Sequence, residues 1–251
     1  MPRAYTRAVS QRLAECQLTH LERTPIDASK AAEQHAGYEA ALAGAGFDIV
    51  RLPELADDPD AVFVEDTALL LDGHAVLTRP GAASRIGEVD STAAGLAGDF
   101  ELHRVERGHV DGGDVLRIGR RLYVGLSTRT DAEGVQALAD LVRPLGFEVV
   151  QAELRDCLHL KTGATFAGSG VLLYNPQAID PAQFGGVEPL AVEEPAAANC
   201  VLARDRLILP AANPLRADRL RSRGFTVVEV DVSELKKAEA GVTCMSLIDD
   251  R

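Results

Sequence analysis

Short hydrophobic runs occur in pairs along this chain, and the pairs recur at a nearly constant spacing. A tight turn rich in glycine or aspartate separates the two runs of most pairs, which is typical of a β-hairpin. Most hairpins are followed by a helical pattern and then by one more hydrophobic run. Units begin near residues 62, 113, 158, 199 and 242, so they are separated by 51, 45, 41 and 43 residues. This repeat predicts five ββαβ units.

The elements of the five units can be placed along the sequence. Hairpin turns are predicted at 72–73, 119–120, 167–170 and 204–205. Helices are predicted at 28–43, 84–96, 130–145 and 214–222, with a weaker one at 176–184 between prolines. The fifth unit is split between the chain ends, because 241–247 provides its first strand and 5–9 the second. The stretches 53–59 and 192–195, rich in proline and acidic residues, are predicted to be loops.

The repeat favours an α/β fold in which the five units form a closed ring. A ring that joins the two ends of the chain needs no exposed edge between its first and last units. The alternative is an α/β domain with a single mixed sheet, and the pattern alone does not separate the two. No linker or low-complexity stretch divides the sequence, so we expect one domain that covers residues 1–251.

Composition excludes several classes of protein. The chain has 38 acidic and 26 basic residues and a net charge of −12, which argues against general binding to nucleic acid or anionic membranes. The charge is compatible with a cationic small-molecule ligand. No apolar run is long enough to span a membrane, and the N-terminus shows no secretory signal. The four cysteines have no CxxC spacing, which indicates reduced thiols and a cytoplasmic protein.

Reactive or charged side chains recur at one place in the repeat, in or just before the first strand of each hairpin. If the units stack around an axis, these side chains meet at its centre. A thiol, an imidazole and a carboxylate together can form a nucleophilic cysteine site. The residues at this place are Glu65, Asp66, Asp111, Asp114, His159, Asn199 and Cys244.

Each of these residues also has a simpler interpretation. A cysteine in an apolar strand is more often buried packing than a nucleophile. His159, between two leucines, is compatible with a hydrogen-bonded structural histidine, and the Asp111–Asp114 stretch with an ordinary turn. Arg85 and Arg129 are either carboxylate anchors or surface charges. Two adjacent carboxylates, Glu65 and Asp66, would need a cation if both lay in the centre of a ring.

The segments FVED, TRPGAASR, VDGGDVLRIGRRLYVGLSTRT, LHLKTG, AANC and GVTCMS occur in this order. Together they resemble the dimethylarginine dimethylaminohydrolases, over nearly the whole chain. This family belongs to the guanidine-modifying superfamily, whose fold is a five-bladed α/β-propeller (pentein) with pseudo-fivefold symmetry. The resemblance implies that Cys244 is the nucleophile, that His159 is the general acid and base, and that Asp111 orients His159.

The resemblance also implies a set of substrate-binding residues. Asp60, Phe63, Glu65 and Asp66 match residues around the substrate guanidinium. Arg85 and Arg129 match residues that hold its amino-acid end, and Leu18 matches a flexible lid. Glu239 stands where related enzymes commonly have an Asp-Gly pair, so this position departs from the family pattern. The sequence leaves open which group Glu239 contacts.

The expected activity is hydrolysis of Nω-methylated L-arginine to L-citrulline and methylamine or dimethylamine. It would proceed through a covalent S-alkylthiouronium on Cys244, without a cofactor or metal ion. Because carboxylates crowd the site, we expect a neutral thiol in the free enzyme. The expected partner is a cationic guanidine, and an apolar flank of the propeller would permit a homodimer.

Three alternatives to this activity remain. One is arginine deiminase activity, although such enzymes usually carry an inserted helical domain for which 251 residues leave no room. Another is hydrolysis of citrulline or a different guanidine by the same residues. The third is a non-catalytic propeller that serves as a binding module.

Overall fold

The computed structural model describes residues 1–193, 198–211 and 214–251, in which short strands alternate with helices. Residues 194 and 195 of the predicted loop at 192–195 lie outside the described residues. The strands are β1 Arg3–Thr6, β2 Asp48–Arg51, β3 Ala68–Leu71, β4 His74–Leu77, β5 Glu101–Arg104, β6 Val115–Ile118, β7 Arg121–Gly125, β8 Glu148–Ala152, β9 Ala164–Gly168, β10 Val171–Tyr174, β11 Glu188–Ala191, β12 Val201–Ala203, β13 Arg206–Pro210, β14 Thr226–Val230 and β15 Leu247–Asp249. The α-helices are α1 Ala28–Gly44, α2 Glu88–Leu96, α3 Ala132–Val142, α4 Leu160–Gly163, α5 Pro214–Ser222 and α6 Ser233–Lys236.

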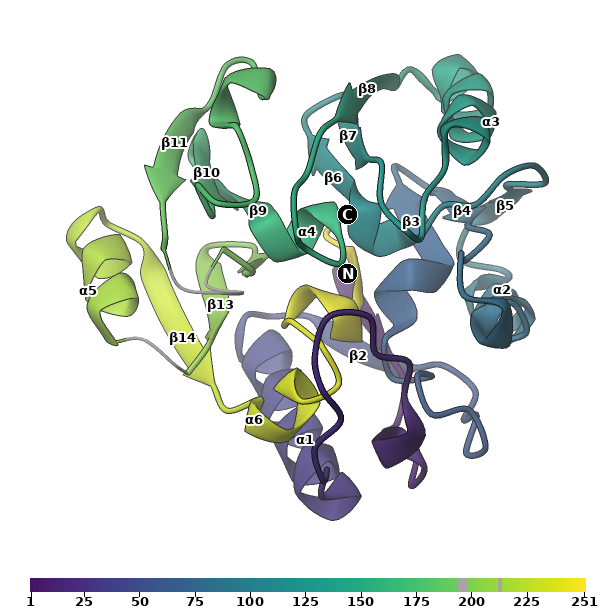
Figure 1. Cartoon of the computed structure of the whole chain (residues 1–251), viewed down its shortest axis with the longest axis horizontal. Helices are drawn as coiled ribbons and strands as arrows, with labels where there is room; N and C mark the ends of the chain where they lie inside the picture. The colour runs from purple at the N-terminus through teal and green to yellow at the C-terminus, as the bar shows by residue number, and fades with distance from the viewer. Residues whose placement is uncertain (194–197, 212–213) are drawn as a thin grey trace.

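Within the described parts of the chain the strands form five separate three-stranded sheets, arranged around one axis (Figure 1). In each sheet the middle strand pairs antiparallel with the first strand and parallel with the third. The pairing orders are β15-β1-β2, β3-β4-β5, β6-β7-β8, β9-β10-β11 and β12-β13-β14. The five-unit propeller predicted from the repeat is therefore confirmed, and the single mixed sheet is wrong.

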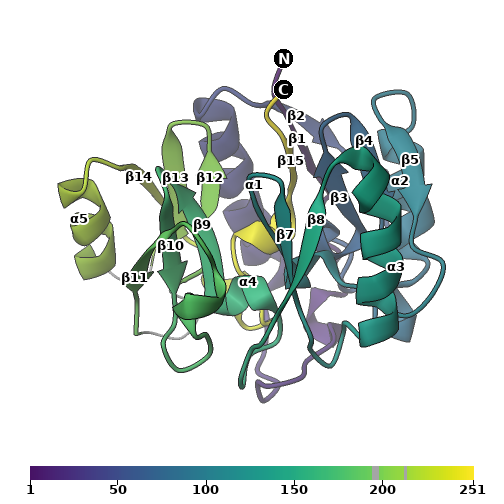
Figure 2. The same cartoon turned by 90° about the horizontal axis from the view of Figure 1, so that it is seen from above.

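The unit split between the chain ends is also confirmed. β15 pairs antiparallel with β1, with Arg3 opposite Asp249, and β1 pairs parallel with β2. The two termini consequently lie side by side, as both views show (Figure 1, Figure 2). The first and last segments of the chain thus close the ring through ordinary strand pairing.

The hairpin turns follow from backbone conformations that few residue types tolerate. Asp72 and Gly73, between β3 and β4, have φ of 50° and 96°. Two consecutive left-handed residues define the turn type that matches the twist of a hairpin, and Asp-Gly is among its preferred sequences. Gly119 at φ 62° and Arg204 at φ 58° occupy the corresponding places in two other predicted turns.

Several predicted boundaries are wrong, and prolines explain two of them. The predicted helix at 176–184 is only a 3₁₀ turn, Pro181–Gln183, because Pro181 has no N–H to continue an α-helix. The predicted helix at 130–145 leaves α-helical geometry after Val142, and Pro144 lies in the 3₁₀ turn Arg143–Leu145 that follows. The helix predicted at 84–96 begins as a separate 3₁₀ turn, Ala83–Arg85, before α2.

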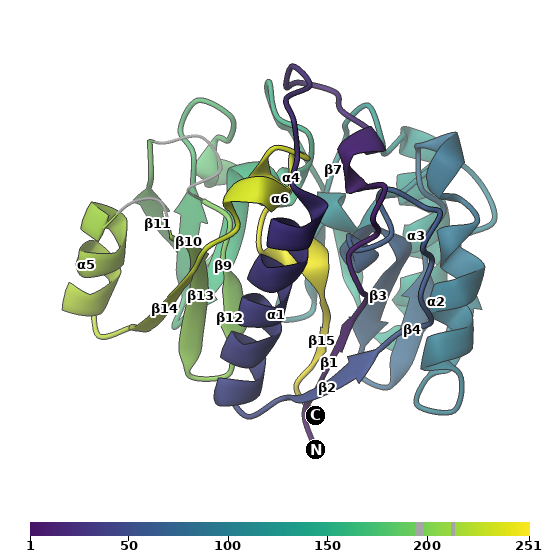
Figure 3. The same ribbon diagram turned by 90° about the horizontal axis from the view of Figure 1, so that it is seen from below.

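The hydrophobic core is divided among the interfaces between neighbouring units, and the longer helices cover the outside of the ring (Figure 3). In the largest cluster, Leu42 of α1 packs with Leu235 of α6 and with Met245. The Tyr38 hydroxyl is 2.6 Å from the Ser246 hydroxyl, which ties α1 to the segment before β15. Among the described residues, no helix is both long and apolar enough to cross a bilayer.

Candidate active site

The reactive residues lie just before the first strands of their units, in or directly before short helical turns, which agrees with the predicted place in or just before these strands. Asp66 lies in Val64–Thr67, Cys244 lies in Thr243–Met245, and Asp111 and His159 precede Gly112–Asp114 and α4. Val64–Thr67 contacts both Gly112–Asp114 and Thr243–Met245, and α4 contacts Gly112–Asp114. The turns therefore meet around the axis, although the side chains do not alternate as they would in strands.

Asp111 holds the imidazole of His159. Nε2 of His159 is 3.0 Å from Oδ2 of Asp111, and both side chains are buried. The other carboxylate oxygen of Asp111 accepts from the Gly81 amide at 2.8 Å. The Asp111 amide donates to the Thr130 hydroxyl at 3.1 Å. Because the carboxylate is bonded on both oxygens, it fixes the orientation of the imidazole ring.

Asp114 anchors the segment that carries the same histidine, a role that the sequence analysis did not assign. Its carboxylate accepts from the Ser127 hydroxyl at 2.6 Å, the Thr130 hydroxyl at 2.7 Å and the Leu160 amide at 2.9 Å. The last bond anchors the start of α4, directly after His159. The second aspartate of VDGGD could have indicated this role. Its partners lie in other segments of the chain, so the motif alone does not identify them.

The buried carboxylates favour the protonated form of His159. Burial by itself lowers the pKa of an imidazole, but Asp66, Asp114 and Asp111 outweigh it and raise the pKa to about 9. His159 and Arg85 in turn outweigh burial at Asp66 and lower the pKa of its carboxyl group. At neutral pH the site therefore holds an imidazolium beside a carboxylate.

The surroundings also keep the thiol of Cys244 protonated, but the protonated form of a thiol is neutral. Burial, followed by the charges of Glu65 and Asp66, raises its pKa to about 12. The Gly241 amide donates to Sγ at 3.4 Å and offsets only part of this effect. The neutral thiol expected from the sequence agrees with these surroundings. A thiolate needs an additional positive charge in the site.

Cys244 and His159 line one small cavity of ≈30 Å³. That volume holds no more than one or two water molecules, so an amino acid can enter only if part of the wall moves. Leu18, Glu65 and Asp111 are the predicted site residues that do not line this cavity. The residues that line it are Gln17, Asp60, Phe63, Asp66, Arg85, Arg129, Leu158, His159, Ala238, Glu239, Ala240 and Cys244.

Glu65 faces away from this cavity, which differs from its expected contact with a guanidinium. One of its carboxylate oxygens forms an ion pair with Lys161, and the other accepts from the Thr243 hydroxyl at 2.8 Å. Glu65 and Lys161 line a second cavity of ≈460 Å³, whose other walls come mainly from the first strands of the units. The cation that the sequence analysis required for Glu65 is therefore Lys161.

Arg85 is largely engaged within the protein. It forms ion pairs with Asp66 and Glu88 and donates to the Phe63 carbonyl at 2.7 Å. Four of the five N–H groups of a guanidinium are used in this way, which leaves one on Nη1. Arg129 also lines the cavity and is half-buried.

The segment 17–21, of which Gln17 lines the cavity, is held by backbone hydrogen bonds to acidic side chains. Asp60 accepts from the Gln17 amide at 3.1 Å. Glu239 accepts from the Thr19 amide at 3.0 Å and from the His20 amide at 2.6 Å. Arg129 donates to the Thr19 hydroxyl at 3.1 Å. Glu239, whose contact the sequence left open, therefore binds the backbone of this segment.

Leu18 is half-buried in that segment and packs against the largest core cluster, not into the cavity. The match of Leu18 to a flexible lid of the family stays a prediction. The carboxylate and imidazole atoms of Asp66, Asp111 and His159 lie within 4.8 Å of one another, close enough for metal ligands. Arg85 and the imidazole itself already balance these carboxylates, so a metal ion is not needed for charge.

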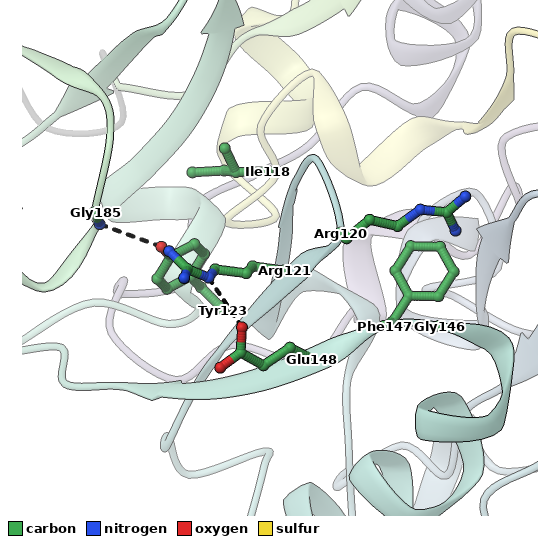
Figure 4. A pocket seen from close by; sticks show the side chains of 8 residues that line it. All are labelled: Ile118, Arg120, Arg121, Tyr123, Gly146, Phe147, Glu148 and Gly185. Atoms are coloured by element: carbon green, nitrogen blue, oxygen red, sulfur yellow. Dashed lines mark hydrogen bonds and ion pairs between the residues drawn. The ribbon is translucent and has the colours of Figure 1, made fainter.

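A larger hollow of ≈550 Å³ lies on the outer flank of β7 and β8 (Figure 4). Arg121 is bonded there to Glu148 at 3.0 Å, and the Tyr123 hydroxyl accepts from the Gly185 amide at 3.2 Å. The Arg120 guanidinium lies 4.8 Å from the centre of the Phe147 ring. None of the predicted reactive residues lines this hollow, so its size does not make it the active site.

Replacing Gly113 with alanine should reduce turnover by about 10²-fold, because a displacement of a reacting group by about 1 Å has an effect of this size. An added Cβ would lie 2.6 Å from Nδ1 of His159 and 2.8 Å from Oδ1 of Asp66, so the imidazole must shift. Steady-state kinetics with circular dichroism would separate this effect from unfolding. Gly37→Ala is the control, since nothing lies within 4 Å of its added Cβ.

Five units around one axis, with a thiol, an imidazole and carboxylates in the turns at their centre, define the pentein class of α/β-propellers. The family model described as arginine deiminase matches residues 91–187. A dimethylarginine dimethylaminohydrolase of Streptomyces coelicolor is 38% identical over 248 residues, which cover 98% of this chain and 96% of the relative. This chain belongs to the dimethylarginine dimethylaminohydrolase family.

Solved structures agree with this assignment. The enzyme of the same name from Pseudomonas aeruginosa, as a mutant complexed with citrulline, superposes with a TM-score of 0.94 at 34% identity. The superposition covers 99% of this chain and 100% of that one. A dimethylarginine dimethylaminohydrolase adduct with S-methyl-L-thiocitrulline gives a TM-score of 0.93, also at 34% identity, and covers the same shares of the two chains.

Proposed function

We propose that this protein hydrolyses Nω-methylated L-arginine to L-citrulline and releases methylamine or dimethylamine. The observation that carries the proposal is that a protonated imidazole, His159, and a neutral thiol, Cys244, line one cavity together with the carboxylate of Asp66. The family assignment and the complexes of relatives with citrulline and with a thiocitrulline support the same reaction. We infer that the whole chain is one catalytic domain, because the turns that build the site come from different units.

The cavity suits a ligand with a positive charge at one end and a carboxylate at the other. Asp60 and Asp66 are buried carboxylates on its wall, and burial raises the pKa of Asp60. A docked guanidinium would compensate their charge, and the Phe63 ring would cover one of its faces. The carboxylate end of the ligand would meet Arg129, and the remaining N–H of Arg85, near segment 17–21.

The reaction begins when the docked cation lowers the pKa of Cys244 and its proton leaves to solvent. The thiolate attacks the guanidinium carbon and forms a C–S bond in a tetrahedral adduct. His159, protonated at neutral pH, donates its proton to the methylated nitrogen, so the C–N bond breaks and the amine departs. The neutral imidazole then takes a proton from water, which attacks the S-alkylthiouronium carbon. The thiolate then leaves and the proton of the added hydroxyl group passes to it, which yields citrulline and restores the neutral thiol.

Alkylation of Cys244 should therefore depend on pH differently with and without a cationic ligand. In the free protein the rate should rise throughout the alkaline range, because the thiol pKa is raised to about 12. A saturating unreactive guanidine should shift this rise to lower pH, since it adds a positive charge beside the sulfur. Iodoacetamide labelling followed by mass spectrometry measures the profile. A low thiol pKa that the ligand does not change would contradict the sequence of steps.

The experiment that tests the function is a product assay with four candidate substrates: asymmetric dimethylarginine, monomethylarginine, arginine and agmatine. We expect citrulline together with dimethylamine or methylamine from the two methylated amino acids. If arginine were the best substrate and gave citrulline and ammonia, the protein would instead be a deiminase, the activity named by the matched family model. No turnover of any of the four would favour a binding module.

All four cysteines of the chain are free thiols in the structure. Reduced thiols persist in reducing compartments, so we place this activity in the cytoplasm. The same reducing conditions keep the proposed nucleophile available, because a disulfide or an oxidised sulfur could not attack the substrate.

A further inference from the structure

Two histidines and a glutamate meet on the β4–β5 pair, away from the cavity described above. The parallel register places His74 opposite Glu101 and Val76 opposite His103. Side chains two residues apart in a strand share a face, so His74, Glu101 and His103 all project from the same side of this sheet. None of the three lines the cavity of Cys244 or enters the proposed mechanism.

The three side chains converge on a common point. His74 Nδ1 is 3.1 Å from His103 Nε2. A Glu101 carboxylate oxygen is 3.5 Å from the first nitrogen, and its other oxygen is 3.7 Å from the second. Zinc binds nitrogen and oxygen at about 2.0–2.2 Å, so two of its ligands in tetrahedral geometry are roughly 3.3 Å apart. The observed separations match this spacing without movement of the backbone.

The surroundings permit coordination and exchange with solvent. The side chains of His74 and His103 are 28% and 22% exposed, and that of Glu101 is 68% exposed. Water can therefore reach the point between them and complete a fourth position. A site with two imidazoles and one carboxylate binds zinc in preference to magnesium or calcium, because the latter two ions prefer oxygen ligands.

We propose that His74, Glu101 and His103 form a binding site for a divalent transition-metal ion, zinc by its donor set. The ion would join the beginnings of β4 and β5, next to the Asp72-Gly73 turn that precedes β4. The competing interpretation is a plain hydrogen bond between one neutral imidazole and the other, with Glu101 as a nearby surface carboxylate. Metal binding distinguishes the two, because a hydrogen-bonded pair without metal affinity would take up no ion.

The test is isothermal titration of untagged, chelator-treated protein with zinc chloride. The parent is Cys244→Ser, because the thiol and imidazole of the active site would otherwise compete for zinc. We expect one zinc ion per chain and a rise in Tm on zinc addition, since an ion that binds only the folded state stabilises it. A cobalt(II) titration would report the geometry by the intensity of its visible absorption. An active-site role is not required, so this result is independent of the product assay.

Variants in the Cys244→Ser background decide where the ion lies. His74→Ala and His103→Ala should each abolish the zinc-dependent rise in Tm, and Glu101→Gln should weaken affinity at least about tenfold. His109→Ala is the matched control, because His109 is a partly exposed histidine paired with Asp131 at 3.0 Å, and it should bind as the parent does. Unchanged stoichiometry in His74→Ala or His103→Ala would place zinc elsewhere and overturn the proposal. So would the absence of zinc binding by the parent.

Discussion

Replacement of Cys244 with serine is expected to reduce turnover of methylated arginine by more than about 10⁴-fold, since loss of a covalent nucleophile has effects of this order. Serine is similar in size, and Cys244 is half-buried, so the fold should persist. A hydroxyl is a much weaker acid than a thiol, and burial together with the neighbouring carboxylates already raises the pKa of Cys244 to about 12. A docked cation would therefore not produce a useful amount of alkoxide.

Two measurements make this prediction specific. Citrulline formation gives the loss of turnover, and intact mass after incubation with a halo-amidine shows whether the sulfur is labelled. Cys200→Ala is the control, because Cys200 is buried 3.0 Å from the Thr165 hydroxyl and lies on the other cavity. The control should retain both labelling and turnover. Turnover by Cys244→Ser close to that of the wild type would remove the thiol from the reaction.

The architecture was predictable because its signals are local. Asp72-Gly73 determines a hairpin by its own backbone preferences, and the helix at Pro214–Ser222 begins and ends where the sequence pattern indicates. Five repetitions of such signals identify the units even where one of them is weak. The helix expected at 176–184 failed for an equally local reason, the proline at 181.

The contacts of the site were not predictable in the same way, because they depend on partners from other units. Glu65 and Asp66 are adjacent, but one pairs with Lys161 and the other with Arg85, on different cavities. No pattern within FVED determines which carboxylate faces which side of a 3₁₀ turn. The same limit applies to Glu239, whose contacts with the backbone of segment 17–21 join residues about 220 positions apart in the sequence.

The second large effect is expected for His159→Ala. Loss of the proton donor should reduce kcat by about 10²–10⁴-fold, because the amine must be protonated before it can leave. The thiol would still be present, so a covalent adduct with a good leaving group should form slowly and persist. Mass spectrometry of the protein after reaction with S-methyl-thiocitrulline measures both the formation and the decay of this adduct.

The pH dependence of stability and of rate gives a second test of His159 as the proton donor. The His159 pKa is raised to about 9, so the imidazolium is favoured in the folded protein. Its contribution to stability is complete below the unfolded pKa near 6.5, and it is lost as pH rises through about 9. Proton donation should decline over the same upper range, and His159→Ala should lack this decline in both stability and rate.

Asp111→Asn tests the same role of His159 through the carboxylate that contacts its imidazole. The amide keeps a hydrogen bond to the imidazole at the 3.0 Å contact but removes one of the charges that raise the His159 pKa. We therefore expect an active protein whose alkaline limit lies at lower pH and whose kcat falls less than in His159→Ala. A merely structural role for Asp111 would lower stability without moving the pH profile. Normal turnover by His159→Ala would show that another group delivers the proton to the departing amine.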